Sequence, residues 1–292
     1  MGAGHEGGLL ERLVWRVIGR TREGRRRFSD DTQMSLDLAD SLLAHPDLDP
    51  DDLARRFAQG YRWSRGYGRG AARLLKQIRS GVDWRVANTA VFPEGSFGNG
   101  AAMRAPVVGV FYAADPAVLL EKAEQSAVIT HAHPLGQEGA VLVALASRLA
   151  LLDGEPFDLL DELKMHARSE AFRDRLSAAR LLLDRGEVPV PVVVRTLGNG
   201  IQATDSCITA IYWAARFLAA SFDDLMTMII AEGGDVDTIG AMAGAIWGAR
   251  NGMEALPSRA LASLEQAGRI RDTAKALFLR RSTVLVKPRP GR

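Results

Sequence analysis

Apolar residues recur every three or four positions along most of this chain, which is the spacing of one face of an α-helix. The alternation of apolar and polar residues expected for a half-buried strand is almost absent. Residues 136–153 are apolar on nearly all sides and predict a central, buried helix. Further helices are predicted over 9–18, 30–43, 51–63, 71–79, 115–129, 157–183, 202–220, 223–231, 241–249 and 257–279.

One segment interrupts this pattern. Residues 188–196 have the strongest β character, but Pro189 and Pro191 argue against a paired central strand, because proline cannot donate a ladder hydrogen bond. We find no fixed-period repeat and no linker. The pattern therefore predicts a single all-α domain with functional residues on the loops at helix ends.

Composition narrows the class of protein without identifying it. The chain has 292 residues, of which 47% are hydrophobic and 25% charged, and its net charge of +2 is too small to indicate nucleic acid or membrane as the main partner. Its single cysteine, Cys207, excludes an intrachain disulfide and a cysteine-rich zinc site. The most apolar run, 141–152, is too short to span a bilayer, and no signal pattern opens the chain. We expect a cytoplasmic protein.

Two acidic clusters stand at predicted helix starts. One follows two glycines, as Gly-Gly-Asp-Val-Asp-Thr-Ile-Gly over 233–240, and the other is Ser-Asp-Asp over 29–31. Side chains two apart point to different sides of a helix, but a Gly-Gly turn removes that restriction, so we expect a loop that holds both Asp235 and Asp237. Hydroxyl and carboxylate oxygens suit Mg²⁺, Mn²⁺ or Ca²⁺, and repulsion among four carboxylates favours two metal ions over one. The alternative is a pair of ordinary acidic helix caps.

A second glycine-rich stretch offers a different chemistry. Residues 95–100 read Gly-Ser-Phe-Gly-Asn-Gly, and such backbone amides without bulky side chains make a good phosphate cradle. The spacing is not that of a dinucleotide-binding fingerprint. The nearby His131 and His133 are better explained as loop or supporting histidines than as zinc ligands, because the chain has only five scattered histidines.

Five motifs in one order carry a resemblance to a known family. They are Ser-Asp-Asp-Thr-Gln-Met, Gly-Ser-Phe-Gly-Asn-Gly-Ala-Ala-Met-Arg, Thr-His-Ala-His-Pro, Leu-Gly-Asn-Gly-Ile and Gly-Gly-Asp-Val-Asp-Thr-Ile-Gly. Over about residues 2–252 the chain resembles the ADP-ribosylglycohydrolases, which include the dinitrogenase reductase-activating glycohydrolases. The Arg-Gly-Tyr-Gly-x-Gly and Leu-Gly-Asn-Gly-Ile stretches look closest to the branch that acts on ADP-ribosylated serine.

The resemblance implies a compact orthogonal bundle of helices over residues 1–281, with 282–292 as a disordered tail. It implies a binuclear Mg²⁺ or Mn²⁺ centre and hydrolysis of an ADP-ribosyl bond, with release of ADP-ribose. The metal ligands it implies are Glu6, Ser29, Asp30, Asp31, Asp235, Asp237 and Thr238. It assigns catalysis to Glu6, Asp30, Asp31 and Asp235. It assigns ADP-ribose binding to Gly70, Gly95, Ser96, Phe97, Gly98, Asn99, His131 and Ile201.

Two departures from the family pattern bear on activity. Val236 replaces a residue that is commonly polar, and the chain starts after the family's usual first helix, which leaves Glu6 near the terminus. We expect a monomeric hydrolase, because all six aligned ligand positions are filled. The alternative is a pseudoenzyme or immunity protein that binds ADP-ribose without turnover. A metal-dependent phosphohydrolase is a third reading, because oxygen-ligated metal pairs also serve phosphoryl transfer. The acceptor remains open among serine, arginine, poly-ADP-ribose, O-acetyl-ADP-ribose and nucleic acid.

Overall fold

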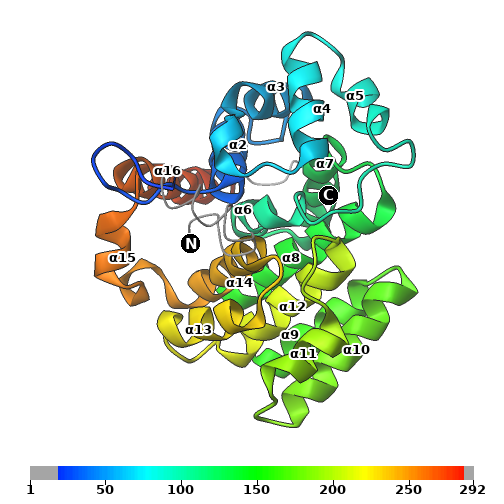
Figure 1. The fold of residues 1–292 in the computed structure, drawn as a ribbon, viewed down its shortest axis with the longest axis vertical. Helices are drawn as coiled ribbons and strands as arrows, with labels where there is room; N and C mark the ends of the chain where they lie inside the picture. Colours follow the sequence, from blue (N-terminus) through cyan, green and yellow to red (C-terminus); the bar gives the residue numbers. More distant parts are fainter. Residues whose placement is uncertain (1–18, 286–292) are drawn as a thin grey trace.

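The computed structural model describes residues 19–285, with side chains to residue 281, and confirms the all-α prediction in this range (Figure 1). Three isolated β-bridges occur, but no sheet is present among the described residues. The helices are α2 (Asp30–Ala44), α3 (Pro50–Gly60), α4 (Arg69–Arg79), α5 (Trp84–Ala90), α6 (Pro106–Phe111), α7 (Pro116–Val128), α8 (Pro134–Leu151), α9 (Pro156–His166), α10 (Glu170–Asp184), α11 (Val190–Leu197), α12 (Ala203–Arg216), α13 (Phe222–Glu232), α14 (Val236–Asn251), α15 (Ser258–Ser263) and α16 (Ala267–Leu285).

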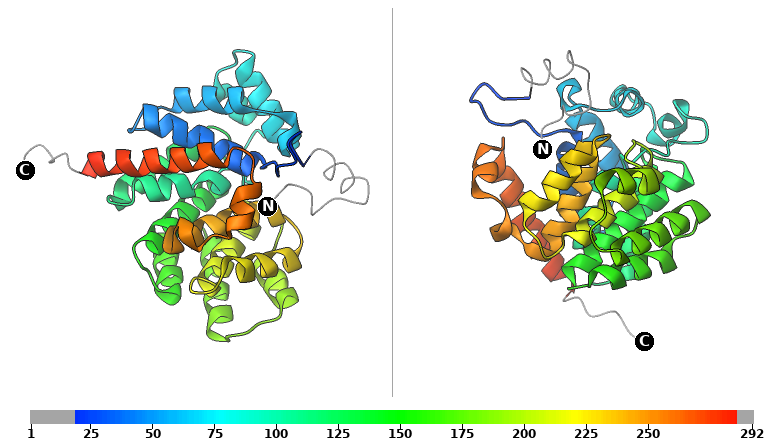
Figure 2. Two further views of the ribbon diagram at one scale, coloured as in Figure 1. Left: turned by 90° about the vertical axis from the view of Figure 1, so that its left-hand side faces the viewer. Right: turned by 60° about the horizontal axis from the view of Figure 1, so that its bottom comes forward.

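Helix α8 lies at the centre, as its uniformly apolar sequence predicts. It packs against α6, α7, α12 and α14, and every residue from Gly139 to Ser147 is buried. Helices α2 to α5 and α9 to α11 lie on opposite sides of this centre in Figure 1 and in the left view of Figure 2. Cys207 on α12 is fully buried, and burial raises the pKa of its thiol. It is therefore a core residue, as expected.

Two predicted helices are each divided in the structure. Residues 157–183 form two helices, α9 and α10, because the backbone N–H groups of Arg168 and Ser169 donate to Glu138 Oε1 at 2.6 and 2.9 Å. This contact comes from α8 and is invisible to local periodicity. Residues 257–279 also divide, into α15 and α16, with Gln266 at a φ of +52° between them.

The pattern predicts none of the three short helices α5, α6 and α11. Residues 190–197, with their β character, form α11, in which Pro191 occupies the first turn, where its missing N–H costs no hydrogen bond. Residues 84–90 form α5, and the Asp83 carboxylate caps it by accepting from the N–H of Arg85. Local propensity is weak in both segments, so packing and capping decide their structure.

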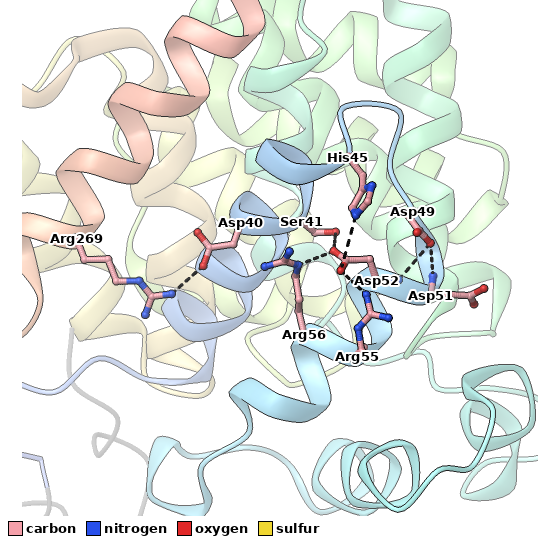
Figure 3. Close-up of polar contacts among 9 residues, drawn as sticks. All are labelled: Asp40, Ser41, His45, Asp49, Asp51, Asp52, Arg55, Arg56 and Arg269. Atoms are coloured by element: carbon pink, nitrogen blue, oxygen red, sulfur yellow. Dashed lines mark hydrogen bonds and ion pairs between the residues drawn. The ribbon is translucent and has the colours of Figure 1, made fainter.

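A polar network fixes α2 against α3 (Figure 3). The Asp52 carboxylate on α3 accepts from the Ser41 hydroxyl of α2 at 2.8 Å and from the guanidinium groups of Arg55 and Arg56. Burial raises the pKa of Asp52, but these hydrogen bonds and charges outweigh it and lower the pKa. At the other side of α2, Arg269 of α16 donates to Asp40 at 2.9 Å. Helix α2, which begins with two acidic residues, is thus held from both sides.

The predicted helix over 9–18 and Glu6 lie outside the described residues, as do residues 286–292 of the predicted tail. The prediction of a disordered tail is wrong for residues 282–285, which form the last turn of α16. No helix within residues 19–285 is long and apolar enough to cross a bilayer.

Candidate functional site

The first acidic cluster lies at the start of α2. Ser29 is the N-cap residue, with an extended backbone at φ −79° and ψ −175°, and Asp30 and Asp31 form the first turn. The hydroxyls of Ser29 and Thr238 both form hydrogen bonds with the buried Asp31 carboxylate. Because backbone N–H groups at a helix N-terminus favour nearby negative charge, this position tolerates two adjacent carboxylates.

The second cluster lies at the start of α14, and its backbone differs from the expected loop. Asp235 has a non-helical backbone at φ −78° and ψ 59°, whereas Asp237 already belongs to the first turn of α14. The helix therefore begins between the two carboxylates, at Val236. The prediction that both residues lie on a loop is wrong for Asp237. The rule that side chains two apart on a helix diverge does not apply here, since Asp235 precedes the helix.

The structure brings the two clusters into electrostatic contact. Burial raises the pKa of Asp30 well above its usual range, and the charges of Asp31, Asp237 and Asp235 add to this effect. Burial and the charge of Asp237 raise the pKa of Asp31 to about 6, although its hydrogen bonds with Ser29 and Thr238 oppose the rise. Four carboxylates from two helix starts thus destabilise one another in the folded protein.

The oxygen atoms of these residues suit a hard cation, but they are not arranged as a complete coordination shell. Asp31 Oδ1 is buried and has no hydrogen-bond partner, and the remaining donors are carboxylate and hydroxyl oxygens. Among residues 19–281, no three acidic, histidine or cysteine side chains are gathered tightly enough to hold a metal ion. A cation would require the hydroxyls of Ser29 and Thr238 to turn lone pairs inward, which freely rotating hydroxyls can do.

Asn99 connects the acidic clusters to the glycine-rich loop 95–100. Its side-chain amide donates to Asp235 Oδ2 at 2.5 Å and to the Ser206 hydroxyl at 2.9 Å. Its backbone N–H donates to the carbonyl of Ile201 at 3.0 Å, and Ala203 N–H donates to the Phe97 carbonyl at 2.9 Å. The loop is therefore fixed to both the start of α12 and the start of α14.

Asn199 makes the corresponding link from the glycine turn 198–200. Its carbonyl accepts from the N–H of Asp235 at 2.8 Å, and its side-chain amide donates to the carbonyl of Glu232 at 3.1 Å. Gly234 allows this approach, because a Cβ there would lie 2.2 Å from the Asn199 carbonyl oxygen. Three glycine-rich segments that are far apart in sequence thus meet at one place.

His131 lies beneath the loop and is uncharged. Its Nδ1 forms a hydrogen bond with the Thr130 hydroxyl at 2.7 Å, and its Nε2 lies 3.6 Å from where a Cβ on Gly98 would be. Burial and the neighbouring charge of Arg104 lower the pKa of His131 to about 3. His133 instead caps α8, with its ring accepting from the N–H of Leu135. Both histidines thus support the loop.

Arg104 is a residue that sequence reasoning did not assign. Its guanidinium is fully buried and donates to the carbonyls of Gly100 and Ser126 and to the Thr130 hydroxyl, at 2.6 to 2.9 Å. Burial lowers its pKa to about 9. Its only sequence signal was its place at the end of the motif over 95–104, four residues after Gly100. It stabilises the underside of that loop.

The remaining predicted binding residues lie at the outer edge of the site. Phe97 and Ile201 are 42% and 69% exposed, and Gly98 has only ordinary contacts around the position of a Cβ. Gly95 packs on the segment before α8, since a Cβ there would lie 2.2 Å from the backbone nitrogen of His133. Gly70, in the first turn of α4, contacts the ring of Phe92. The backbone carbonyl of Phe92 in turn accepts a hydrogen bond from the N–H of Gly95 at 2.8 Å.

Comparison with known proteins places these features in context. A sequence model described as ADP-ribosylglycohydrolase matches residues 4–285. The chain is 37% identical to the ADP-ribosylhydrolase ARH3 of Mus musculus, over 79% of this chain and 71% of that protein, and 36% identical to the Homo sapiens protein of the same name, over 79% and 72%. A solved structure titled ADP-ribosylglycohydrolase-related protein complex matches with a TM-score of 0.66 at 28% identity, over 86% of this chain and 80% of that one.

Replacing each of the two adjacent glycines with alanine tests the contact between Gly234 and Asn199. Gly233 and Gly234 both have a positive φ, of +68° and +67°, but only Gly234 would collide with a neighbour. Both substitutions carry a backbone cost of about 1–3 kcal/mol. We expect Gly234→Ala to lower the free energy of unfolding by roughly a further 1–3 kcal/mol, because the turn at Asn199 must move. Equal losses in denaturant unfolding would contradict this packing.

Carboxylate repulsion predicts an unusual pH dependence in the presence of a chelator. The pKa of Asp31 is higher in the folded protein than in the unfolded chain, so the stability present at pH 4 is lost as the pH rises through 6. The loss from Asp31 is on the order of 2–3 kcal/mol. Asp31→Asn keeps an oxygen acceptor for the Ser29 hydroxyl. It should remove the part of the change in unfolding free energy with pH (the slope) that comes from Asp31.

The matched control is Asp158→Asn, which changes an exposed carboxylate on α9. It should leave the slope unchanged. Urea unfolding of the three proteins between pH 4 and 7 measures the difference, and a parental slope in Asp31→Asn would show that the clusters do not repel as described.

Proposed function

Since this chain belongs to the ADP-ribosylglycohydrolase family and is a glycohydrolase, we propose that it hydrolyses ADP-ribosyl bonds at the acidic clusters and releases ADP-ribose in a reaction that depends on two divalent cations. The observation that carries the proposal is the Asn99 bridge. It places a loop suited to a diphosphate directly against Asp235, and thus against the four carboxylates. Binding of the diphosphate and bond cleavage can therefore occur side by side.

The loop supplies specific groups for the diphosphate. Within 95–99, the N–H groups of Gly95, Gly98 and Asn99 already donate to other protein atoms. The N–H groups of Ser96 and Phe97 have no partner within the described part of the chain, so we assign phosphate binding to these two. A Cβ on Gly98 would meet only ordinary contacts, one of them with Nε2 of the neutral His131 that supports the loop.

The exposed apolar residues suit the adenosine. Phe97 and Ile201 flank the loop and remain accessible, and the Phe97 ring packs 5.4 Å from that of His133. A purine stacked here would leave the distal ribose on the side of Asp235, since Asn99 directly follows Gly98 and contacts this carboxylate. This orientation directs the anomeric carbon toward the acidic clusters.

The carboxylates would hold the cations, with Mg²⁺ or Mn²⁺ as the hard ions that their oxygens favour. The ligands we propose are Ser29, Asp30, Asp31, Asp235, Asp237 and Thr238, with Glu6 assigned from the family resemblance. When bound, such ions neutralise the cluster, polarise ribose hydroxyls and lower the pKa of a bound water. Asn99 orients Asp235 for this role, and Ser29 and Thr238 orient Asp31.

Protons must also be managed during cleavage. Burial raises the pKa of Asp30 well above its usual range when no cation is bound, and we assign Asp30 to the catalytic set from the family resemblance. Glu6 lies outside the described residues, and its role as general base stays a prediction from the resemblance. Asp31 and Asp235 complete the proposed catalytic set.

A release assay with product identification tests this function. The protein would be incubated with peptides ADP-ribosylated on serine or arginine, with O-acetyl-ADP-ribose and with poly-ADP-ribose, in Mg²⁺, Mn²⁺ or EDTA. We expect free ADP-ribose from at least one substrate, and a loss of roughly 10²–10⁴-fold on Asp235→Asn. Asp158→Asn is the matched control and should retain the parental rate.

The outcomes separate the parts of the proposal. Release that persists at the full rate in EDTA would remove the metal requirement alone. Formation of AMP and ribose phosphate would mean a phosphohydrolase, and binding of ADP-ribose without any product would mean a pseudoenzyme.

A further inference from the structure

A segment beside the site concentrates positive charge. Residues 61–82 contain six cations, Arg62, Arg65, Arg69, Arg73, Lys76 and Arg79, and no acidic residue. The whole chain has a net charge of +2, so the other residues together carry −4. Such segregation produces a local positive field that the modest net charge conceals.

Helix α4 presents most of this charge on one face. Arg69, Arg73 and Lys76 are exposed and follow one another at spacings of four and three residues. Together with the small or neutral residues Ala72, Gln77 and Ser80, they line an open hollow of about 520 Å³. We call this surface, with Arg79 at its end, the basic face of α4.

The cations of this face have no acidic partners in the described part of the chain, unlike most others nearby. Arg65 pairs with Glu265, and Arg55 and Arg56 pair with Asp52. In contrast, Lys76 and Arg79 only lie 5.7 Å from the centre of the Tyr61 ring. The positive charge of the face is therefore available to a bound anion.

The face begins next to the hydrolytic site. Helix α4 packs against α3 and α5 at the edge of the molecule, which leaves its outer side open (Figure 1). Gly70 in its first turn contacts Phe92, which is bonded to the loop 95–100. Burial raises the pKa of Tyr67, directly before α4, and the charges of Asp37 and Asp30 add to the rise, so Tyr67 lies near the acidic clusters. A polyanion on α4 would thus end beside these clusters.

An exposed aromatic residue distinguishes between possible polyanions. Trp63, in the turn between α3 and α4, is 75% exposed, although large aromatic residues normally bury most of their surface. Positive charge interleaved with accessible aromatic rings is typical of surfaces on which bases of a single strand stack. An acidic peptide would use the cations but offers no bases to stack on Trp63.

We propose that the basic face of α4, together with Trp63, binds single-stranded nucleic acid beside the hydrolytic site. From Arg69 to Arg79 the helix rises about 15 Å, at 1.5 Å per residue. At about 3.4 Å per nucleotide along a strand, this length covers about four nucleotides. Binding at this face is a second property of the protein and does not depend on turnover.

The test measures binding of a fluorescent ten-nucleotide DNA or RNA strand without ADP-ribose, by anisotropy at several salt concentrations. The triple variant R73Q/K76Q/R79Q should bind at least tenfold more weakly in low salt. The slope of log affinity against log salt concentration should be less steep by about 2. Three cations are removed, and each single-strand phosphate contact contributes about 0.7 to this slope. Trp63→Leu should weaken binding by about 5- to 100-fold through loss of stacking.

The matched control is R259Q/R271Q/K275Q, which removes three exposed cations from α15 and α16 and so changes net charge equally. It should bind like the parent. Absence of binding by the parent, or equal losses in the two triple variants, would overturn the proposal. So would equal competition by a ten-residue glutamate peptide, which would assign the face to acidic proteins.

ADP-ribose release from a small substrate is measured in parallel and should be unchanged in R73Q/K76Q/R79Q. Because strand binding is measured without turnover, failure of the hydrolase proposal would leave this result interpretable.

Discussion

Mutual repulsion among carboxylates is the constraint on which the site depends. Asp30, Asp31, Asp235 and Asp237 come from two helix starts, and burial together with their charges raises the pKa of Asp30 and of Asp31. Helix N-termini, two hydroxyls and the Asn99 amide offset only part of this cost. Because the fold keeps these carboxylates buried and close together, a cation bound among them would relieve their repulsion.

The surrounding structure keeps this cluster and the loop in fixed relation. Helix α14 packs against the central helix α8, and α2 packs against α14. The polar network around Asp52 and the pair of Arg269 and Asp40 hold α2 in place. Asn99 and Asn199 connect three glycine-rich segments by hydrogen bonds between residues distant in sequence. Arg104 supports the loop with a buried charge that is stabilised by carbonyl groups in place of a carboxylate. Disruption of any of these contacts would move the diphosphate loop relative to the carboxylates.

Helical periodicity predicted most of the fold, because the core faces of helices such as α2, α7, α8 and α12 are strongly apolar. It failed where distant groups decide the backbone, as in the break after α9, which Glu138 stabilises from α8. The site was harder to predict from residues alone. Spacing indicated two acidic clusters and a phosphate loop, but only the family resemblance joined them, since the bridge from Asn99 to Asp235 spans 136 residues. Arg104 left no pattern that would identify it.

The central claim is that the acidic clusters and the glycine-rich loop form one metal-dependent ADP-ribose site. Anomalous diffraction from crystals grown with Mn²⁺ and ADP-ribose tests it most directly, because it locates the ions and the nucleotide together. The account predicts two manganese peaks among Asp30, Asp31, Asp235 and Asp237, with the diphosphate against the N–H groups of Ser96 and Phe97. A nucleotide bound elsewhere, or bound at the loop with no manganese at these carboxylates, would contradict it.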